Sequence, residues 1–557
     1  MLEKYKSTKG ITLVALVITI IVLLILAGIT LSMVLGPNGI IERAKEAKEK
    51  TEMAQQQEQS SLESVLGQIE QAMGTQYDKD KKVNKPQIVT GMTPIKFTEP
   101  TDTDKGTTLE TNSTDSEWYN YDNKKWANTK TQDGSMWVWI PRYAYKVNSA
   151  TKTFDIVFLI GTTDNYYDAE GKVQTAKRAK TADEIVDTTT GYTVHPAFTN
   201  ESNINYVNGG WDKELSGIWV AKFEAGYASG NNNAKVKASS VNYSQTEVWA
   251  PGQETGGSDG NLPARNWLDG AYGSTQTAIK YPTFQGSTYA MNYINHNDSF
   301  NISKVLNEKG NIYGLSTDSD SHLMKNSEWG AVAYLSQSKY GLNGTNIYVN
   351  NANLNNSIAS VYAVTGCSGA SENAGANTIT IANINGTTGN TANSNTYTWN
   401  QKNGQRASSS GTIYGIYDLS GGTWERTAAY VANGNGNLKS FGASIAYDGN
   451  TLKTASTKYT TVYPSNDSGE TNIDTASQKN YALNTKIYGD AIRETSTAGT
   501  ESSSWYSDYS YFPALYNPFS VRGGDLWNTS SAGLFYFYRN NGYSNFNNGF
   551  RPVVLAQ

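Results

Sequence analysis

Few residues of this chain could carry covalent or metal chemistry. Among 557 residues there are one cysteine, Cys367, and three histidines, His195, His296 and His322. The cysteine has no adjacent histidine or basic cluster to lower its pKa, and the histidines lack the spacing of a metal site. No serine triad, phosphate loop or metalloprotease motif is present. The sequence therefore favours a binding protein over an enzyme.

Two aspartates offer the remaining candidate metal site. Asp318 and Asp320 precede a helix predicted over 321–336, and they could hold a structural calcium ion. They lack the full ligand spacing of a calcium loop, so helix capping is the favoured role. His322 is expected at the surface or in the cap. No cofactor is expected apart from this structural calcium.

The stretch 521–554, VRGGDLWNTSSAGLFYFYRNNGYSNFNNGFRPVV, is rich in aromatic and amide side chains. Rings give a large contact area at low entropic cost, and Asn, Ser and Gly give adaptable hydrogen bonds. In a strand over 534–539 only alternate side chains share a face, and we expect the tyrosines to point outward because their hydroxyls need water or a partner. The predicted ligand-binding residues are Trp527, Asn528, Tyr536, Tyr538, Arg539, Asn540, Asn541, Tyr543, Phe546 and Asn547.

The ends of this stretch indicate a rigid frame. The paired Gly523 and Gly524 let the backbone approach a neighbour closely, and the run 549–554 predicts a final core strand in which Arg551 could bind a carboxylate. Just before the stretch, five aromatic residues could extend the binding surface or form its floor. They are Tyr506, Tyr509, Tyr511, Phe512 and Tyr516.

Three segments carry a family resemblance. The pair RGG (522–524) and GFR (549–551), with LMKNSEWGAVAY (323–334) and YDLSGGTWERT (417–427), resembles the formylglycine-generating, or sulfatase-modifying, family. The resemblance implies a large loop-rich C-type lectin-like domain over 117–557 with an Asn/Gly-rich insertion at 341–411. The residues that would frame this fold are Glu328, Trp329, Trp424, Glu425, Arg522, Gly523, Gly524, Gly549, Phe550 and Arg551.

The chain departs from that family where its chemistry would lie. The enzymes use a pair of cysteines to hold copper, and the corresponding stretch 534–541, LFYFYRNN, has none. A related iron-dependent sulfoxide synthase would need a three-histidine site, which the histidine spacing does not provide. The sequence therefore predicts binding of an unknown protein or glycan ligand without catalysis. A formylglycine-enzyme-like oxidoreductase is the alternative.

The composition of 527–548 also resembles the variable region of proteins diversified by retroelements through adenine-directed mutation. Asn is the unmutated product there, and Tyr, Ser, Asp and Phe are one or two substitutions away. A loop of fixed sequence is the alternative. Either alternative leaves a surface suited to binding.

The N-terminus predicts a membrane anchor. Residues 11–35 carry no charge, and about 25 helical residues reach about 37 Å, enough to cross a bilayer core. Lys4, Lys6 and Lys9 place the N-terminus in the cytoplasm and the later residues outside the cell. The leader 1–10 and the apolar helix resemble a type IV prepilin, which implies cleavage between Gly10 and Ile11.

One position departs from the prepilin pattern, because Ala15 stands where pilins usually carry Glu. Assembly with pilin subunits therefore stays open, and an uncleaved signal anchor or a structural minor pseudopilin is the alternative. A stalk helix over 36–75 follows a Gly-Pro break, and 76–116 predicts a linker. The predicted fold class is thus α+β, with a long N-terminal transmembrane and stalk helix before the lectin-like domain.

Charge and cysteine content limit which partners and which location the sequence predicts. The 45 basic and 50 acidic side chains give no basic footprint for nucleic acid. The 37 tyrosines and 51 glycines are typical of a loop-rich extracellular fold, and a single cysteine excludes a disulfide framework. With the lysine-rich leader, this predicts a membrane-bound protein at the cell surface of a Gram-positive bacterium or encoded by its prophage.

Overall fold

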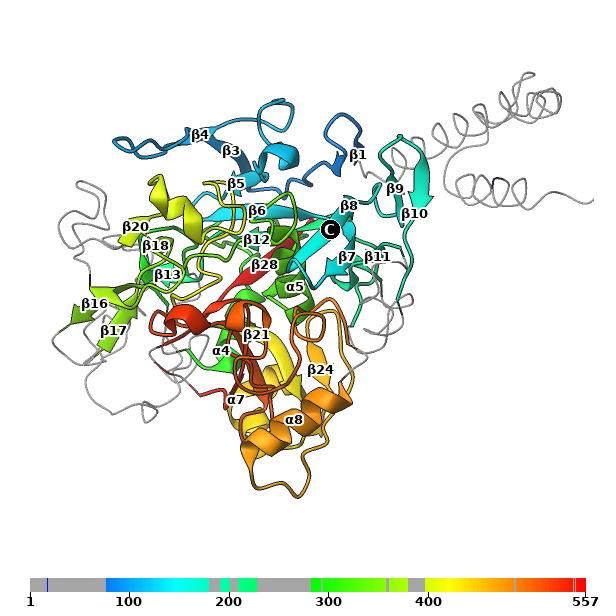
Figure 1. The fold of residues 1–557 in the computed structure, drawn as a ribbon, viewed down its shortest axis with the longest axis vertical. Coiled ribbons are helices and arrows are strands. Elements are labelled where there is room, and N and C mark those ends of the chain that lie inside the picture. The colour runs from blue at the N-terminus through cyan, green and yellow to red at the C-terminus, as the bar shows by residue number, and fades with distance from the viewer. Residues whose placement is uncertain are drawn as a thin grey trace, which may run out of the picture.

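A seven-stranded antiparallel sheet forms the centre of the computed structural model (Figure 1). The structure describes residue 18 and residues 77–179, 191–200, 209–227, 282–291, 294–356, 360–378, 396–484, 487–543, 545 and 547–556. The strand order is β15 (Asp320–Leu323), β28 (Pro552–Leu555), β12 (Gly217–Ala221), β6 (Met136–Pro141), β5 (Asn128–Lys130), β3 (Thr93–Phe97) and β4 (Thr108–Glu110). The C-terminal strand β28 therefore lies between two strands from the middle of the chain.

A second sheet carries the C-terminal aromatic stretch. Its order is β24 (Thr461–Tyr463), β21 (Trp424–Val431), β25 (Phe519–Gly523) and β26 (Gly533–Asn540), and β27 (Asn548–Phe550) also pairs with β21. β21 runs parallel to β24 and β27 and antiparallel to β25. β21 thus joins the two ends of the stretch, because β25 contains its first residues and β27 lies near its end.

Short sheets and helices surround these two sheets. The three-stranded sheets are β11 (Thr193–Val194), β7 (Tyr143–Asn148), β8 (Thr153–Phe158), and β17 (Ser360–Ala363), β16 (Ala352–Asn356), β19 (Asn377–Thr378). The two-stranded pairs are β1 (Tyr77–Asp78) with β2 (Val83–Asn84), β9 (Asn165–Tyr167) with β10 (Val173–Thr175), β13 (Gly226–Tyr227) with β14 (Tyr289–Ala290), β18 (Cys367–Gly369) with β20 (Thr396–Thr398), and β22 (Tyr447–Asp448) with β23 (Thr451–Leu452). The described α-helices are α4 (His296–Ser303), α5 (Asn326–Ser336), α7 (Gly436–Ala446) and α8 (Ile473–Leu483).

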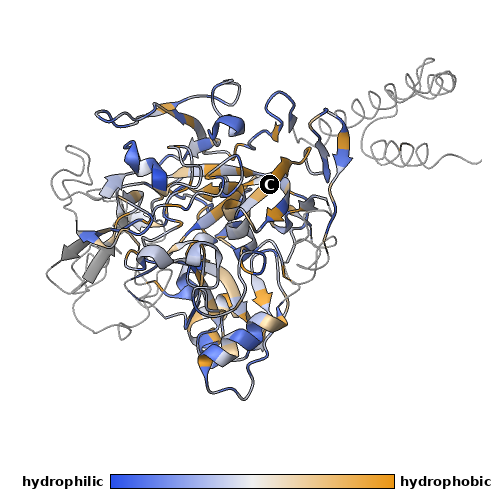
Figure 2. Ribbon diagram, in the orientation of Figure 1, coloured by the Kyte–Doolittle hydropathy of each residue, from blue (hydrophilic) through white to orange (hydrophobic). Residues whose placement is uncertain are grey.

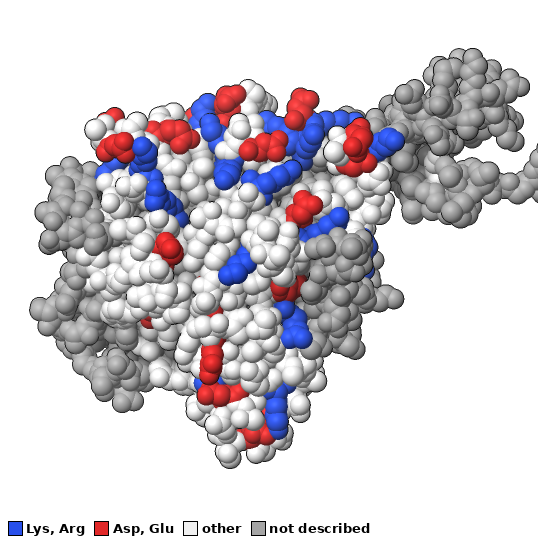
Figure 3. All heavy atoms as spheres, in the orientation of Figure 1, with Lys and Arg blue, Asp and Glu red and all other residues white. Residues whose placement is uncertain are grey.

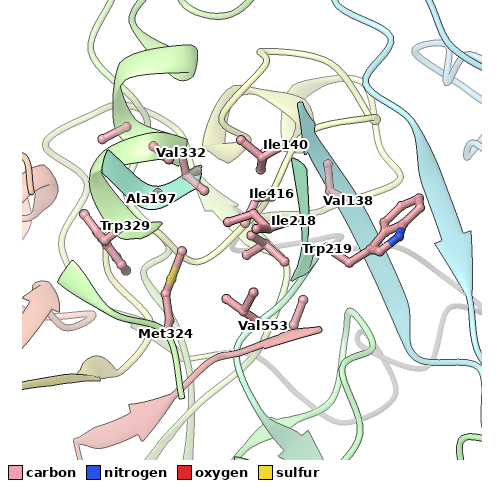
Figure 4. Close-up of a cluster of buried hydrophobic side chains, with 14 of the residues drawn as sticks. Val138, Ile140, Ala197, Ile218, Trp219, Met324, Trp329, Val332, Ile416 and Val553 are labelled. Carbon is pink, nitrogen blue, oxygen red and sulfur yellow. The ribbon is translucent and has the colours of Figure 1, made fainter. Parts of the chain in front are cut away.

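The core lies between the seven-stranded sheet and α5. Figure 4 shows Ile140 of β6, Ile218 of β12 and Val553 of β28 in one cluster with Trp329 and Val332 of α5. All five side chains are essentially inaccessible to solvent, and burying an aliphatic side chain stabilises a fold by about 1.5–3 kcal/mol. The hydrophobic strands stand out at the centre of Figure 2. The core strands expected at 136–143 and 217–224 are confirmed by β6 and β12.

The predicted fold class, with its long N-terminal transmembrane and stalk helix, is wrong for the part of the chain that the structure describes. Strands dominate there, and α5, α7 and α8 are the longest helices, with 11 residues each. None of the helices in these same residues combines the length and the apolar character that a membrane span requires. For this part of the chain, the finding contradicts the predicted transmembrane anchor, on which the predicted cell-surface location rested. Apart from Ile18, the segments 1–10, 11–35 and 36–75, with Gly10 and Ile11, lie outside the described residues.

Two further expectations are wrong because strands form where a linker and the start of a helix were predicted. The described part of the predicted linker 76–116 forms β1 to β4, and Ile95 and Phe97 of β3 are buried. The helix predicted from 321 begins only at Asn326, because 320–323 pairs with β28 as a strand. At 320–323, long-range pairing thus overrides the local capping signals.

Within the predicted insertion 341–411, the structure describes 341–356, 360–378 and 396–411. Val349, Val364 and Cys367 are fully buried there. The insertion therefore packs against the domain through a few apolar side chains despite its Asn- and Gly-rich composition.

Candidate functional site

β26 holds the tyrosine-rich part of the C-terminal stretch inside a sheet. β25 pairs with one side of β26. On the other side, Tyr511 N donates to Phe537 O (2.9 Å) and Phe537 N donates to Tyr509 O (3.1 Å). Phe535 and Phe537 are fully buried, whereas Tyr538 on the other face is only half-buried. The strand therefore presents the ring of Tyr538 between two flanking segments.

Four half-buried rings meet at this point, and we call Trp424, Tyr509, Tyr511 and Tyr538 the Tyr538 platform. The ring of Tyr538 stacks with Tyr509 (centroids 6.1 Å apart, planes at 15°) and with Trp424 (5.6 Å, 26°). Tyr511 meets Tyr538 edge-on at 5.4 Å. Such ring pairs contribute about 0.5–1.5 kcal/mol beyond their buried area. The platform is therefore a packed cluster of aromatic rings that solvent reaches in part.

The only cation in contact with the platform among the described residues, Arg539, is neutralised by α8. Its guanidinium lies 4.4 Å from the centroid of the Tyr511 ring. Its Nη2 donates to Asp474 Oδ1 (2.7 Å) and its Nη1 to Ser477 Oγ (2.8 Å). The charge of Arg539 is therefore paired with Asp474 beside the rings.

Amide side chains from both ends of the stretch brace the platform. Asn528 Oδ1 accepts from Trp424 Nε1 (2.8 Å) and from the backbone of Asp525 (2.8 Å). Asn547 Nδ2 donates to Asp525 Oδ2 (2.9 Å), and burial raises the pKa of the Asp525 carboxyl. Next to them, Trp527 is 40% exposed. The side-chain amides of Asn528 and Asn547 thus form hydrogen bonds within the site and hold its surface in place.

The predicted ligand-binding residues fall into different positions. Tyr536, expected to face outward with Tyr538, is only 1% exposed, and its ring lies 6.1 Å from that of Tyr538 as a floor beneath the platform. Burial raises the pKa of Tyr536 well above its usual value. Asn541 and Tyr543 are half-buried. Phe546 lies outside the described residues.

Buried arginines hold the frame of the site. Arg551 forms an ion pair with Glu425 through two contacts, one of them Nε to Oε2 at 2.9 Å. Arg522 donates to the carbonyls of Asp490 (3.0 Å) and Ala491 (2.9 Å). The expectation that Arg551 binds a carboxylate is confirmed.

The remaining frame residues fix the turns and the start of α5. Gly523 and Gly524 have φ of 84° and 76°, a left-handed backbone that favours glycine. Trp329 Nε1 donates to Leu534 O at the start of β26 (2.8 Å). Glu328 Oε2 accepts from Lys325 N (2.8 Å) and thereby caps α5. Gly549 lies in β27 beside the fully buried Phe550.

A second cluster of ionisable groups lies beneath the frame. Glu224, Asp418 and Glu425 are at most 1% exposed. Burial raises the pKa of Asp418 to about 6 and that of Glu425 to about 7, although Arg551 opposes both shifts. Glu224 Oε2 accepts from Thr423 N (3.1 Å). Solvent does not reach these carboxylates, and the contact of Glu224 with Thr423 joins the segment after β12 to the segment before β21, which serves the fold.

The thiol and the histidines are also internal. Cys367 is fully buried, and this burial raises its pKa. His322, expected at the surface, is fully buried between Asp320 (2.8 Å) and Glu328 (2.9 Å). Burial lowers the pKa of His322, but the two carboxylates outweigh it and raise the pKa to about 9. Within the described ranges, no group of three His, Cys, Asp or Glu side chains could hold a metal ion.

The sequence indicated some platform residues more clearly than others. Tyr509 and Tyr511 were expected beside the surface, and they extend it. Trp424 was expected only in the frame, but its half-exposed ring belongs to the platform. Arg426 was not singled out, although it is fully buried and donates to the side chain of Asn540 (3.0 Å). Its only sequence signal is its position two residues after Trp424.

Comparison with known proteins found no family model and no curated protein that matches this chain. The resemblances of its N-terminal and C-terminal segments therefore stay predictions.

Proposed function

We propose that this chain binds a ligand without transforming it, that the Tyr538 platform is the binding surface, and that the ligand is a neutral saccharide chain. The observation that carries the proposal is the stack of half-exposed rings around Tyr538, which Tyr509 and Trp424 hold at fixed spacing. Aromatic rings held in this way provide contact area without losing side-chain entropy on binding.

The chemistry of the platform favours a neutral ligand. Arg539 is paired with Asp474, and Asp525 is buried against Asn547. A charged ligand would find little to pair with at these residues. The tyrosine hydroxyls and the partly exposed Asn541 instead suit a ligand that offers many hydroxyl groups.

Three aliphatic side chains near the platform are buried rather than exposed beside the rings. Val521, Leu526 and Leu534, the neighbours of the platform in the sequence, are at most 2% exposed. The core of a protein interface is broadly apolar. A sugar ring needs an aromatic face for its C–H groups and polar groups around the rim, which is what the platform offers.

Catalysis by the single thiol is disfavoured by its surroundings. Cys367 is fully buried and its pKa is raised, so the thiolate that would bind copper or attack a substrate is not accessible. This supports recognition over the oxidoreductase alternative.

The test is affinity electrophoresis of the full-length chain in native gels that contain neutral polysaccharides, with a glycan array to widen the panel. We expect retardation by at least one neutral polysaccharide, and at least a tenfold loss of affinity in Tyr538→Ala, as for a central aromatic contact. Tyr538→Phe should keep most of the affinity because it retains the ring.

Tyr397→Ala is the matched control, since Tyr397 is half-buried in β20 and outside the platform. Equal affinity of Tyr538→Ala and the parent chain would refute the assignment of the site. Absence of binding to every neutral glycan, with binding to a protein that Tyr538→Ala abolishes, would overturn the saccharide ligand and retain the surface.

A further inference from the structure

Arg426 is a buried cation whose hydrogen bonds go to neutral groups at the edge of the candidate site. It lies in β21 and is fully buried. Its Nε donates to Ile294 O (3.0 Å), its Nη1 to Asn540 Oδ1 (3.0 Å) and its Nη2 to Tyr543 O (2.6 Å). Burial lowers the pKa of Arg426 to about 9. Burying a guanidinium is costly, and two of these acceptors belong to the end of β26 and the turn that follows it.

Asn540 links that guanidinium to both ends of the segment between β26 and β27. Its Oδ1 also accepts from Gly542 N (2.8 Å), and its Nδ2 donates to Asn548 Oδ1 (3.3 Å) at the start of β27. One side chain therefore joins Arg426, the turn at Gly542 and the return strand. Asn540, predicted as an adaptable ligand contact, makes these internal bonds instead.

His296 supports the same turn from the opposite side. Its backbone N–H donates to Gly542 O (2.9 Å), and its ring stacks on Phe519 with centroids 4.3 Å apart. Its Nε2 lies 2.8 Å from Thr427 O, so this nitrogen carries the proton and Nδ1 is left to accept from Arg426 Nη1 (3.4 Å). Burial and the neighbouring guanidinium lower the pKa of His296, which is consistent with a neutral acceptor.

The turn itself admits no other residue at Gly542. Its φ is 95°, and a Cβ there would lie 2.5 Å from the ring of Phe519. The backbone at 540–543 is thus held by a buried guanidinium, a histidine backbone and a glycine conformation. Tyr543 leaves this turn half-buried, with its ring 5.9 Å from Phe441.

We propose that Arg426 and Asn540 form a clamp that positions residues 541–543 as a preformed second arm of the binding surface, beside the Tyr538 platform. Arg426 is then a positioning residue, because it acts on the ligand only through Asn540 and the backbone of Tyr543. A preformed arm lowers the entropy that binding must otherwise remove. The part that concerns ligand affinity rests on the proposed function, whereas the clamp itself does not.

The first test uses hydrogen–deuterium exchange of the full-length chain without any ligand. Arg426→Lys keeps the charge but loses the fork of donors, and Asn540→Ala removes the shared acceptor from a half-buried position. We expect amides within 540–548 to exchange at least tenfold faster in both variants. Exchange in β28, residues 552–555, should not change.

Asn541→Ala is the matched control, because Asn541 makes a single longer bond, from Tyr543 N to its Oδ1 (3.3 Å). It should change exchange of the same peptide by no more than about twofold, since that bond is a weak one. If Arg426→Lys unfolds the whole domain, the exchange of Asn540→Ala alone tests the clamp. Unchanged exchange over 540–548 in Asn540→Ala would overturn the clamp.

The second test measures affinity for the neutral polysaccharide that retards the parent chain most strongly. Asn540→Ala should lower this affinity at least fivefold, mainly through slower association, while the melting temperature of the domain stays within a few degrees of the parent. A faster-exchanging loop with unchanged affinity would overturn the role in positioning. A clamp seen by exchange in a chain that binds no saccharide would refute only the proposed ligand.

Discussion

Replacement of Glu494 by Gln should remove a pH dependence that the structure builds into this fold. The Glu494 side chain is 5% exposed, and its Oε1 accepts from Tyr145 Oη (3.0 Å) and Gly489 N (2.6 Å). Its Oε2 has no hydrogen-bond partner among the described residues. Burial, with the nearby carboxylate of Asp490, raises the pKa of Glu494 from 4.5 to about 7.

The sign of the effect follows from proton binding. Between pH 4.5 and pH 7 the folded chain holds the Glu494 proton, whereas the unfolded chain has lost it. The free energy of unfolding therefore falls as the pH rises through this range, and it levels off above pH 7. Since one pKa unit corresponds to about 1.4 kcal/mol, the carboxyl of Glu494 costs the folded state about 3 kcal/mol at pH 8 compared with pH 4.

Glutamine has the same shape and stays neutral. Glu494→Gln should therefore match the parent within about 1 kcal/mol at pH 4.5 and be more stable by about 2–3 kcal/mol at pH 8, as the linkage predicts. The assay is urea unfolding followed by tryptophan fluorescence at both pH values. Glu170→Gln, at an exposed turn, is the control. A difference between Glu494→Gln and the parent that is the same at pH 4.5 and pH 8 would show that Glu494 is not held protonated.

Two further outcomes check the interior of the domain. Arg551→Met leaves the buried carboxylate of Glu425 unpaired and should cost about 3–5 kcal/mol in the free energy of unfolding at pH 8, and the double variant with Glu425→Leu should recover much of this loss. A purely additive double variant would contradict the pairing. Cys367 should react with a thiol reagent at least a hundredfold more slowly in native chain than in guanidinium-unfolded chain, because burial both shields it and raises its pKa. Rapid labelling of the native chain would disprove its burial.

Local sequence patterns predicted the elements whose secondary structure depends least on the segments that pack against them. The apolar runs that became β6 and β12 are rich in aromatic and β-branched residues, which favour strands in most contexts. Arg551, which lies just before the last strand, was expected to bind a carboxylate, and it pairs with Glu425. A fully buried guanidinium requires such partners wherever it lies.

Long-range pairing decided what those patterns could not. Residues 320–323 carry capping signals, yet they form β15 because β28 supplies their hydrogen bonds from the other end of the chain. The alternation of β26 was predicted correctly for Phe535 and Phe537, but Tyr536 is covered as well. Alternation describes a single strand, and only the elements packed above it determine which of its faces solvent reaches.

The sequence by itself therefore determined that aromatic, amide and glycine residues are concentrated near the C-terminus, because composition is independent of the fold. Tertiary structure alone decided that Trp424 joins Tyr538 across the sheet, that Arg539 is neutralised by α8, and that Asn540 turns inward to Arg426. These contacts join residues far apart in the sequence or on separate strands. Their energies depend on distance and burial, which no local pattern of residues encodes.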